Sequence, residues 1–123
     1  MLTTLTTSRL VLAELGRSYP SSDRNGLQQF ARRLGQWLED ASVKAVVIDA
    51  SRTEAAGASL LGVLVRAHRL AQSAGKEFLI AGASGQLLEI LKLAKLQRVL
   101  KLVTSSKDVL VERLDMKVIR AAG

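Results

Sequence analysis

The chain has no cysteine and very few aromatic residues. Without cysteine it cannot form a disulfide, hold a metal through thiolates or use a thiol nucleophile. A reducing compartment is compatible with this absence. Aromatic residues make up only 3% of the 123 positions, so we expect a core built from leucine, valine, isoleucine and alanine. Such a core suits helices packed on a sheet.

Groups that could carry catalysis are scarce. His68 is the only histidine, and no serine or aspartate lies at a spacing typical of a catalytic triad. The chain has no nucleotide-binding glycine pattern, no phosphate-binding loop and no histidine–glutamate metal pattern. Its acidic residues are dispersed, so a paired-carboxylate enzyme would need acids that only the fold brings together. We therefore expect no enzyme activity, no cofactor and no metal site.

Long apolar runs and a basic leader are also missing. The longest apolar run, around residues 60–65, is far too short to cross a bilayer, and residues 1–7 do not resemble a secretory signal. We expect a cytoplasmic protein with no membrane span. Apolar residues make up 48% and charged residues 24% of the chain, which is the balance of a globular domain.

The charge is strongly basic. Eighteen lysines and arginines against eleven acids give a formal net charge of +7, which is typical of proteins that meet an acidic partner, a nucleic acid or an anionic membrane. The cations are spread along the chain, with no dense run and no interleaved aromatic residues that could stack on bases. We favour a solvated polar face and expect no nucleic-acid function. Weak, salt-sensitive nucleic-acid binding is kept as an alternative.

The hydrophobic pattern alternates between strands and helices, and serines precede the last two helices. Ser84, and either Ser105 or Ser106, are expected to cap them. This alternation implies a mostly parallel sheet with right-handed crossovers. We expect one α/β domain over residues 1–123, with a mostly parallel (mixed) sheet of four to five strands, about four helices, a core at about 10–114 and a tail at 115–123. The pattern predicts strands at 10–15, 45–48, 78–81 and 99–103, and helices at 26–40, 59–74, 87–94 and 107–114.

The loop between the strand that ends at Asp49 and the helix that begins at Ser59 is the segment of most chemical interest. Ligand and partner sites in open α/β sheets favour the carboxyl ends of the strands. Free N–H groups at the helix start would attract a hydroxyl, an anion or a phosphate. The simple role of Ser59 is the helix N-cap, and a modified side chain is the alternative. Gly57 is the natural place for a positive φ angle at this turn.

Residues 45–51 and 59–69 read AVVIDAS and SLLGVLVRAHR. They resemble the core of the STAS family, usually written V-V-I-D-L-S…D-S-S-G-L-G-V-L, and the match needs no insertion. Residues 75–82 and 91–100 are similar to the next strand of that family and to the end of its following helix. The resemblance covers nearly all of residues 10–114. It implies a non-enzymatic bacterial signalling module in transcription regulation, the anti-sigma-factor antagonist, which binds a serine kinase that is also an anti-sigma factor.

In that family the kinase phosphorylates a serine at the start of this helix, and the added charge of about −1.5 to −2 disrupts docking. Aligned without gaps, the family's D-S-S-G falls on residues 57–60. Gly57 takes the acidic position and Ala58, which has no hydroxyl, takes the position of the phosphoacceptor. Ser59 matches the second, normally unmodified serine and is the displaced candidate. We expect a lost switch and a permanently available binding module.

The resemblance implies a docking surface on the loop and on the exposed side of the following helix. An alternative within the same family is a small cytosolic STAS subunit that braces the ATPase of a membrane transporter, where a basic surface would suit a position near anionic lipid. A homodimer is also open. The expected partner-binding residues are Asp49, Thr53, Glu54, Gly57, Ala58, Ser59 and Leu61 in the loop, and Arg66 and Arg69 on the helix.

Overall fold

The structure is a computed structural model that describes residues 9–19, 24–112 and 117–122. Its centre is a five-stranded sheet in the order β6-β5-β3-β1-β7, and every neighbouring pair is parallel. This confirms the expected α/β domain with a parallel sheet. The strands are β1 (Arg9–Glu14), β3 (Val43–Asp49), β5 (Glu77–Ala81), β6 (Lys101–Val103) and β7 (Lys117–Ala122).

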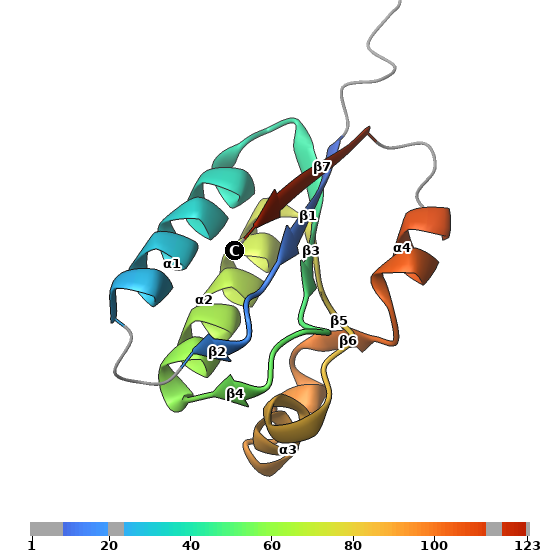
Figure 1. Ribbon diagram of the computed structural model, residues 1–123. Helices are drawn as coiled ribbons and strands as arrows, with labels where there is room; N and C mark the ends of the chain where they lie inside the picture. Colours follow the sequence, from blue (N-terminus) through green and yellow to red (C-terminus); the bar gives the residue numbers. More distant parts are fainter. Residues whose placement is uncertain (1–8, 20–23, 113–116, 123) are drawn as a thin grey trace, which may run out of the picture.

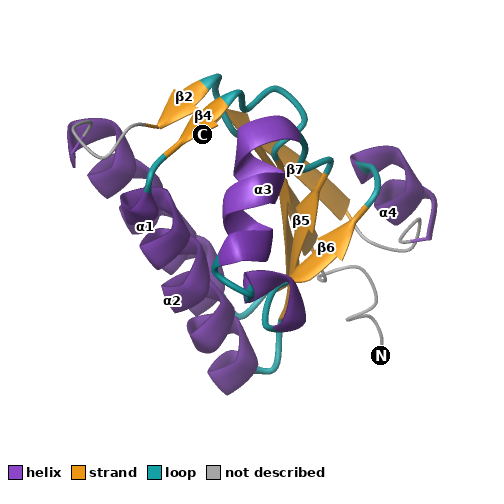
Figure 2. Ribbon diagram, turned by 90° about the horizontal axis from the view of Figure 1, so that it is seen from below, coloured by secondary structure: helices purple, strands orange, loops and turns teal. Residues whose placement is uncertain are grey.

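Helices cover both faces of this sheet (Figures 1 and 2). Three pack on one face through a large apolar cluster, and a short one packs on the other face through a smaller cluster. The three are α1 (Arg24–Glu39), α2 (Ala58–Ala74) and α3 (Gly85–Leu93), and the short one is α4 (Ser106–Glu112). A single 3-10 turn, η1 (Leu96–Arg98), follows α3. Expected and observed helices agree to within about two residues at the described ends, the usual uncertainty of such boundaries.

The strand pattern follows from this two-sided covering. Successive side chains of a strand point to opposite faces, so a strand covered on both sides is apolar throughout. In β3, Val46 and Ile48 face α1, α2 and α3, whereas Ala45 and Val47 face α4. All four are at most 1% exposed. This is why the sequence shows a continuous apolar run here rather than an alternating one.

The residues after Leu114 contain a strand, where the sequence pattern predicts only a tail. β7 pairs in parallel with β1 over its whole length, from Arg9↔Lys117 to Glu14↔Ala122. The short run KVIRAA carries too little hydrophobic pattern to predict a strand by itself, and it gains its backbone partners only from β1. Residues 113–116, where the predicted last helix would end, lie outside the described residues.

A small second sheet was not anticipated from the sequence. β2 (Ser18–Tyr19) pairs in parallel with β4 (Ala55–Ala56). Strands of two residues carry no periodicity of their own, so only their partner defines them. The pair joins the segment after β1 to the segment before α2.

Two expectations about helix starts need correction. The N-cap of α2 is Gly57 rather than Ser59, which is the second residue of the helix. The φ angle of Gly57 is −109° with ψ 178°, so it is extended, and the positive φ expected there is absent. Ser84 does occupy the N-cap position of α3, although without a side-chain capping bond. For α4 the cap is Ser105, whose Oγ accepts a hydrogen bond from the Lys107 N–H at 3.0 Å.

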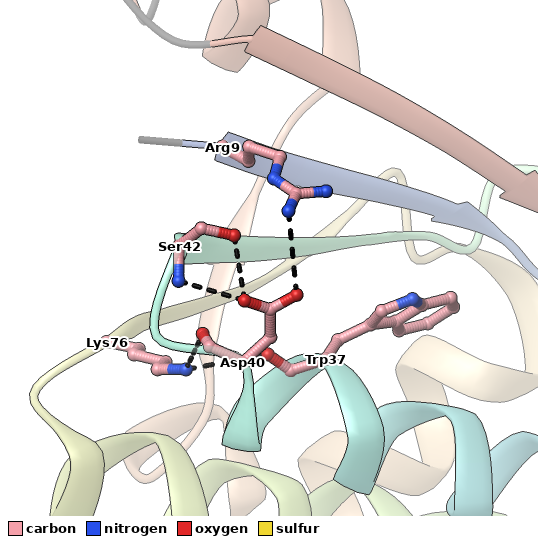
Figure 3. A network of polar contacts seen from close by, with 5 residues as sticks. All are labelled: Arg9, Trp37, Asp40, Ser42 and Lys76. Atoms are coloured by element: carbon pink, nitrogen blue, oxygen red, sulfur yellow. Dashed lines mark hydrogen bonds and ion pairs between the residues drawn. The ribbon is translucent and has the colours of Figure 1, made fainter. Parts of the chain in front are cut away.

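A polar network around Asp40 ties the end of α1 to three other segments (Figure 3). The Oδ1 atom of Asp40 accepts hydrogen bonds from the N–H (2.9 Å) and hydroxyl (2.7 Å) of Ser42, and Oδ2 lies 3.8 Å from Nη2 of Arg9. The Lys76 ammonium donates to the carbonyl oxygens of Asp40 (2.6 Å) and Trp37 (3.5 Å). The last turn of α1 has no basic residue, so Lys76 supplies the cation that helix carbonyls favour.

Gly82 sets how closely the end of β5 approaches the loop after β3. Its φ angle is +72°, and a Cβ placed there would lie 3.0 Å from the Ser51 Cβ and 3.3 Å from the Ser51 Cα. Both the backbone conformation and the contact require glycine at this position.

The Asp40→Asn variant should flatten the acid dependence of stability. Hydrogen bonds from the Ser42 hydroxyl and N–H lower the pKa of Asp40 from its ordinary value of 3.8. A lowered folded-state pKa stabilises the protein above the unfolded value, and this contribution is lost as pH falls through the folded value. We expect the free energy of unfolding of the variant to change less than that of the wild type between about pH 5 and pH 2. The control Glu89→Gln, which removes an exposed carboxylate on α3, should keep the wild-type slope.

The Gly82→Ala and Gly35→Ala variants should change stability in opposite directions. We expect Gly82→Ala to lower the free energy of unfolding by about 1–3 kcal/mol because it strains a left-handed residue against the Ser51 backbone. Gly35 lies inside α1, and a Cβ added there would meet no atom within 4 Å, so alanine should raise the free energy of unfolding by about 0.5–1 kcal/mol. Urea unfolding measures both. A Gly82→Ala variant as stable as the wild type would contradict the close approach.

Candidate functional site

Asp49, the last residue of β3, is an internal anchor at the carboxyl edge of the sheet. Its Oδ1 accepts hydrogen bonds from the N–H (2.9 Å) and hydroxyl (2.6 Å) of Ser51, and its Oδ2 accepts one from the Ser106 hydroxyl (2.9 Å). Partial burial raises the pKa of Asp49, but these hydrogen bonds outweigh it and lower the pKa overall. The carboxylate therefore joins the loop after β3 to the start of α4, and its oxygens already have partners.

Two of the expected docking residues are buried and help to fix the position of the loop. Thr53 is only 3% exposed, and its hydroxyl donates to the Gly16 carbonyl at 2.9 Å. Leu61 is 9% exposed and belongs to the main core cluster. Neither side chain is open to a partner. Both instead fix the position of the residues between them.

Hydrogen bonds donated by backbone N–H groups fix the same loop from its two sides. The Glu54 N–H donates to the Arg17 carbonyl at 2.7 Å, next to the β2–β4 pair. The Ala56 N–H donates to the Gln86 Oε1 of α3 at 3.3 Å. A loop held by two separate parts of the chain is ordered before any partner arrives, which lowers the entropic cost of docking.

The open part of the predicted surface is a groove between α1 and α2, with a volume of about 620 Å³. Ser59 and Arg66 lie seven residues apart on α2 and so share one helix face. Helix α1 supplies the opposite wall, which the sequence did not predict. The only signal for it was the apolar stripe of α1, whose edge residues remain in part uncovered. The groove is lined by Leu27, Gln28, Ala31, Ser59, Gly62, Val63 and Arg66.

Glu54 lies in a different hollow. This one has a volume of about 400 Å³ and is formed at the carboxyl edge of the sheet, with Arg17 and Arg52 among its lining residues. Arg52 also pairs with Glu14, at 4.0 Å between Nη1 and Oε2. Arg69 is exposed on α2 but does not line the groove. The predicted residues are thus divided between two surfaces and the interior.

The first two residues of α2 are an alanine and a serine. Ala58, at the position of the family's phosphoacceptor, is the first helical residue and is exposed. Ser59 is the next residue, exposed, with its side chain on the groove. His68 lies half-buried further along the same helix. Within the described residues no cluster of histidine, cysteine, aspartate or glutamate could hold a metal. In that same part of the chain, no helix is both long and apolar enough to span a membrane.

Comparison with known proteins places this geometry in a family. The fold matches a crystal structure from Thermotoga maritima whose assignment as an anti-sigma factor antagonist is itself provisional. The two share 17% sequence identity over 80% of each chain, with a TM-score of 0.66, which is a likeness of fold. No curated protein matches the sequence. The family model described as "Mlab, STAS domain" matches residues 21–104, more than half of the chain, and the protein therefore belongs to the STAS family.

Proposed function

We propose that this STAS domain is a regulatory protein-binding module of the anti-sigma-factor-antagonist type. Its partner docks in the groove between α1 and α2 and against the start of α2. The observation that carries the proposal is that Ser59 and Arg66 both line an open groove of about 620 Å³. This groove lies beside a loop that is already ordered. The resemblance indicates a serine kinase that is also an anti-sigma factor as the partner. No turnover is expected from this site.

The groove combines apolar and polar contacts in the way that partner sites do. Among its aliphatic lining residues Ala31 is partly exposed, whereas Leu27 and Val63 are largely buried, and Arg66 adds an exposed cation. Arginine is one of the residues that most often dominates binding energy at protein interfaces. A partner that presents an apolar side chain next to an acid would satisfy both parts of this groove.

Binding is constitutive in this proposal. The exposed first residue of α2 is Ala58, which offers no hydroxyl to a kinase. Ser59 has a hydroxyl, but it is displaced by one residue, which on a helix rotates the side chain by about 100°. A kinase site that accepts the first helical position would therefore present Ser59 in the wrong direction. The domain stays available to its partner at all times.

A permanent structural role is the second candidate. A STAS subunit that braces the ATPase of a membrane transporter needs no off switch, and the alanine at position 58 fits this requirement equally well. Affinity purification of the tagged protein from its native cells, followed by mass spectrometry, separates the two candidates. A serine kinase or sigma-factor regulator as the main partner supports the first. A membrane-transport ATPase as the main partner overturns it in favour of the second.

Alanine substitutions of two arginines on α2 test whether the partner docks in the groove. With the partner recovered by purification, Arg66→Ala should weaken binding by about tenfold or more, because it removes the cation at the groove rim. Arg69→Ala removes another exposed arginine of α2, which lies outside the groove lining, and should weaken binding by less than about threefold. Titration calorimetry gives both affinities. Equal losses in the two variants would move the docking surface away from the groove.

The absent switch is tested by restoring a hydroxyl. The Ala58→Ser variant places serine at the family's acceptor position, and serine at the first turn of a helix is well tolerated. Incubated with the recovered kinase and ATP, the variant should gain one phosphate and release its partner, whereas the wild type should gain none. Mass spectrometry of the intact protein reads both. Phosphate on Ser59 of the wild-type protein would show that the switch is displaced rather than lost.

A further inference from the structure

A second exposed surface lies where α3 ends and the chain turns towards β6 (Figure 2). We name residues 92–101, which read KLAKLQRVLK, the basic turn. It has four cations and no acidic residue, and it shares no residue with the groove between α1 and α2. All four cations are exposed: Lys92, Lys95, Arg98 and Lys101.

Two aliphatic side chains of the basic turn are unusually open to water. Leu93 is 84% exposed and Val99 is 48% exposed. Leu91 and Leu100 lie close to them in the chain and are at most 2% exposed, so the segment is anchored to the core at both ends. An apolar side chain with this exposure stands clear of its neighbours. Single exposed leucines are common, but here two aliphatic residues lie within one short, purely cationic segment.

The backbone of the basic turn is fixed by its own hydrogen bonds. The Lys95 N–H donates to the Lys92 carbonyl at 3.0 Å, and the Leu100 N–H donates to the Leu96 carbonyl at 2.7 Å. Lys95 has a φ angle of +60°, which is uncommon for a residue other than glycine. The positive φ ends α3 and starts η1, and thereby keeps Leu93 and Val99 on the surface rather than in a longer helix.

The cations of the basic turn form no ion pair and no side-chain hydrogen bond within the part of the chain that the structure describes. The ion pairs found there join Arg9 to Asp40 and Arg52 to Glu14. Neither involves the basic turn, and no described side-chain hydrogen bond involves it either. Its charges are therefore available to an external anion.

We propose that the basic turn binds the surface of an anionic lipid bilayer. Leu93 and Val99 enter the headgroup region, and the four cations of the same segment meet lipid phosphates. Attachment of this kind depends on both the buried apolar area and the attraction of basic residues to anionic lipid. The site goes beyond the protein-binding role, because none of its residues belongs to the groove.

The composition of the segment favours a bilayer over other anionic partners. Single-stranded nucleic acids are held by aromatic side chains on which the bases stack, and the basic turn contains none. An extended acidic polypeptide would use the cations but offers no pocket to a leucine that is 84% exposed. A fluid headgroup layer accepts a protruding aliphatic side chain without a complementary shape.

The test is sedimentation of the full chain with lipid vesicles at about 0.1 M salt, where exposed charges more than about 10 Å apart are largely screened. Vesicles of phosphatidylcholine alone are compared with vesicles that contain phosphatidylglycerol in equal parts. We expect binding to the anionic vesicles only. Lys92→Gln/Lys95→Gln/Arg98→Gln should lower the partition coefficient by about tenfold or more. Leu93→Ser should lower it by about fivefold while leaving the charge unchanged.

A matched control removes the same charge elsewhere. Arg17→Gln/Arg32→Gln/Lys107→Gln neutralises three exposed cations outside the basic turn and should change the partition coefficient by less than about twofold. Circular dichroism verifies that each variant is folded. The proposal is overturned if the control loses as much binding as the first triple variant, if Leu93→Ser binds as the wild type does, or if no vesicle is bound. Binding of a nucleic acid or an acidic polypeptide in place of vesicles also overturns it.

Discussion

The burial of parallel strands on both faces is the constraint from which the rest of the structure follows. Parallel pairing requires a crossover after each strand, and the crossover helices must then cover the sheet. Because the side chains of β3 are buried on both faces of the sheet, polar groups are confined to the ends of the strand. Asp49 is the first such group after the run of buried residues, and it anchors the loop that leads to α2. The loop before α2 is therefore built at the edge that the sheet leaves free.

Residues of the loop and of α2 fall into two groups, buried and open. Thr53 and Leu61 are buried and fix the loop, whereas Ser59 and Arg66 stay open on the groove. The proposed docking surface is rigid because its supporting residues are part of the core. Ala58 is not one of these supporting residues. The proposed absence of a phosphorylation switch is therefore compatible with an intact fold, since the position of the switch and the supporting residues are different side chains.

The two surfaces of the domain differ in physical character. The groove is concave, with walls from two helices, and suits a shaped partner. The basic turn is a short segment with exposed aliphatic side chains and exposed cations, and suits the fluid, anionic surface of a bilayer. Because the two proposed surfaces share no residues, a partner that contacts only one of them leaves the residues of the other uncovered.

The sequence by itself determined the parallel α/β fold, because hydrophobic periodicity reports which faces of a local segment are covered. It also located the loop after Asp49 and the alanine at position 58, which are matters of order along the chain. It could not decide what depends on distant partners. β7 exists as a strand only through pairing with β1, and α1 became a wall of the groove only through packing on α2. Tertiary contacts, rather than local pattern, also decided that Thr53 is buried and Ser59 lines the groove.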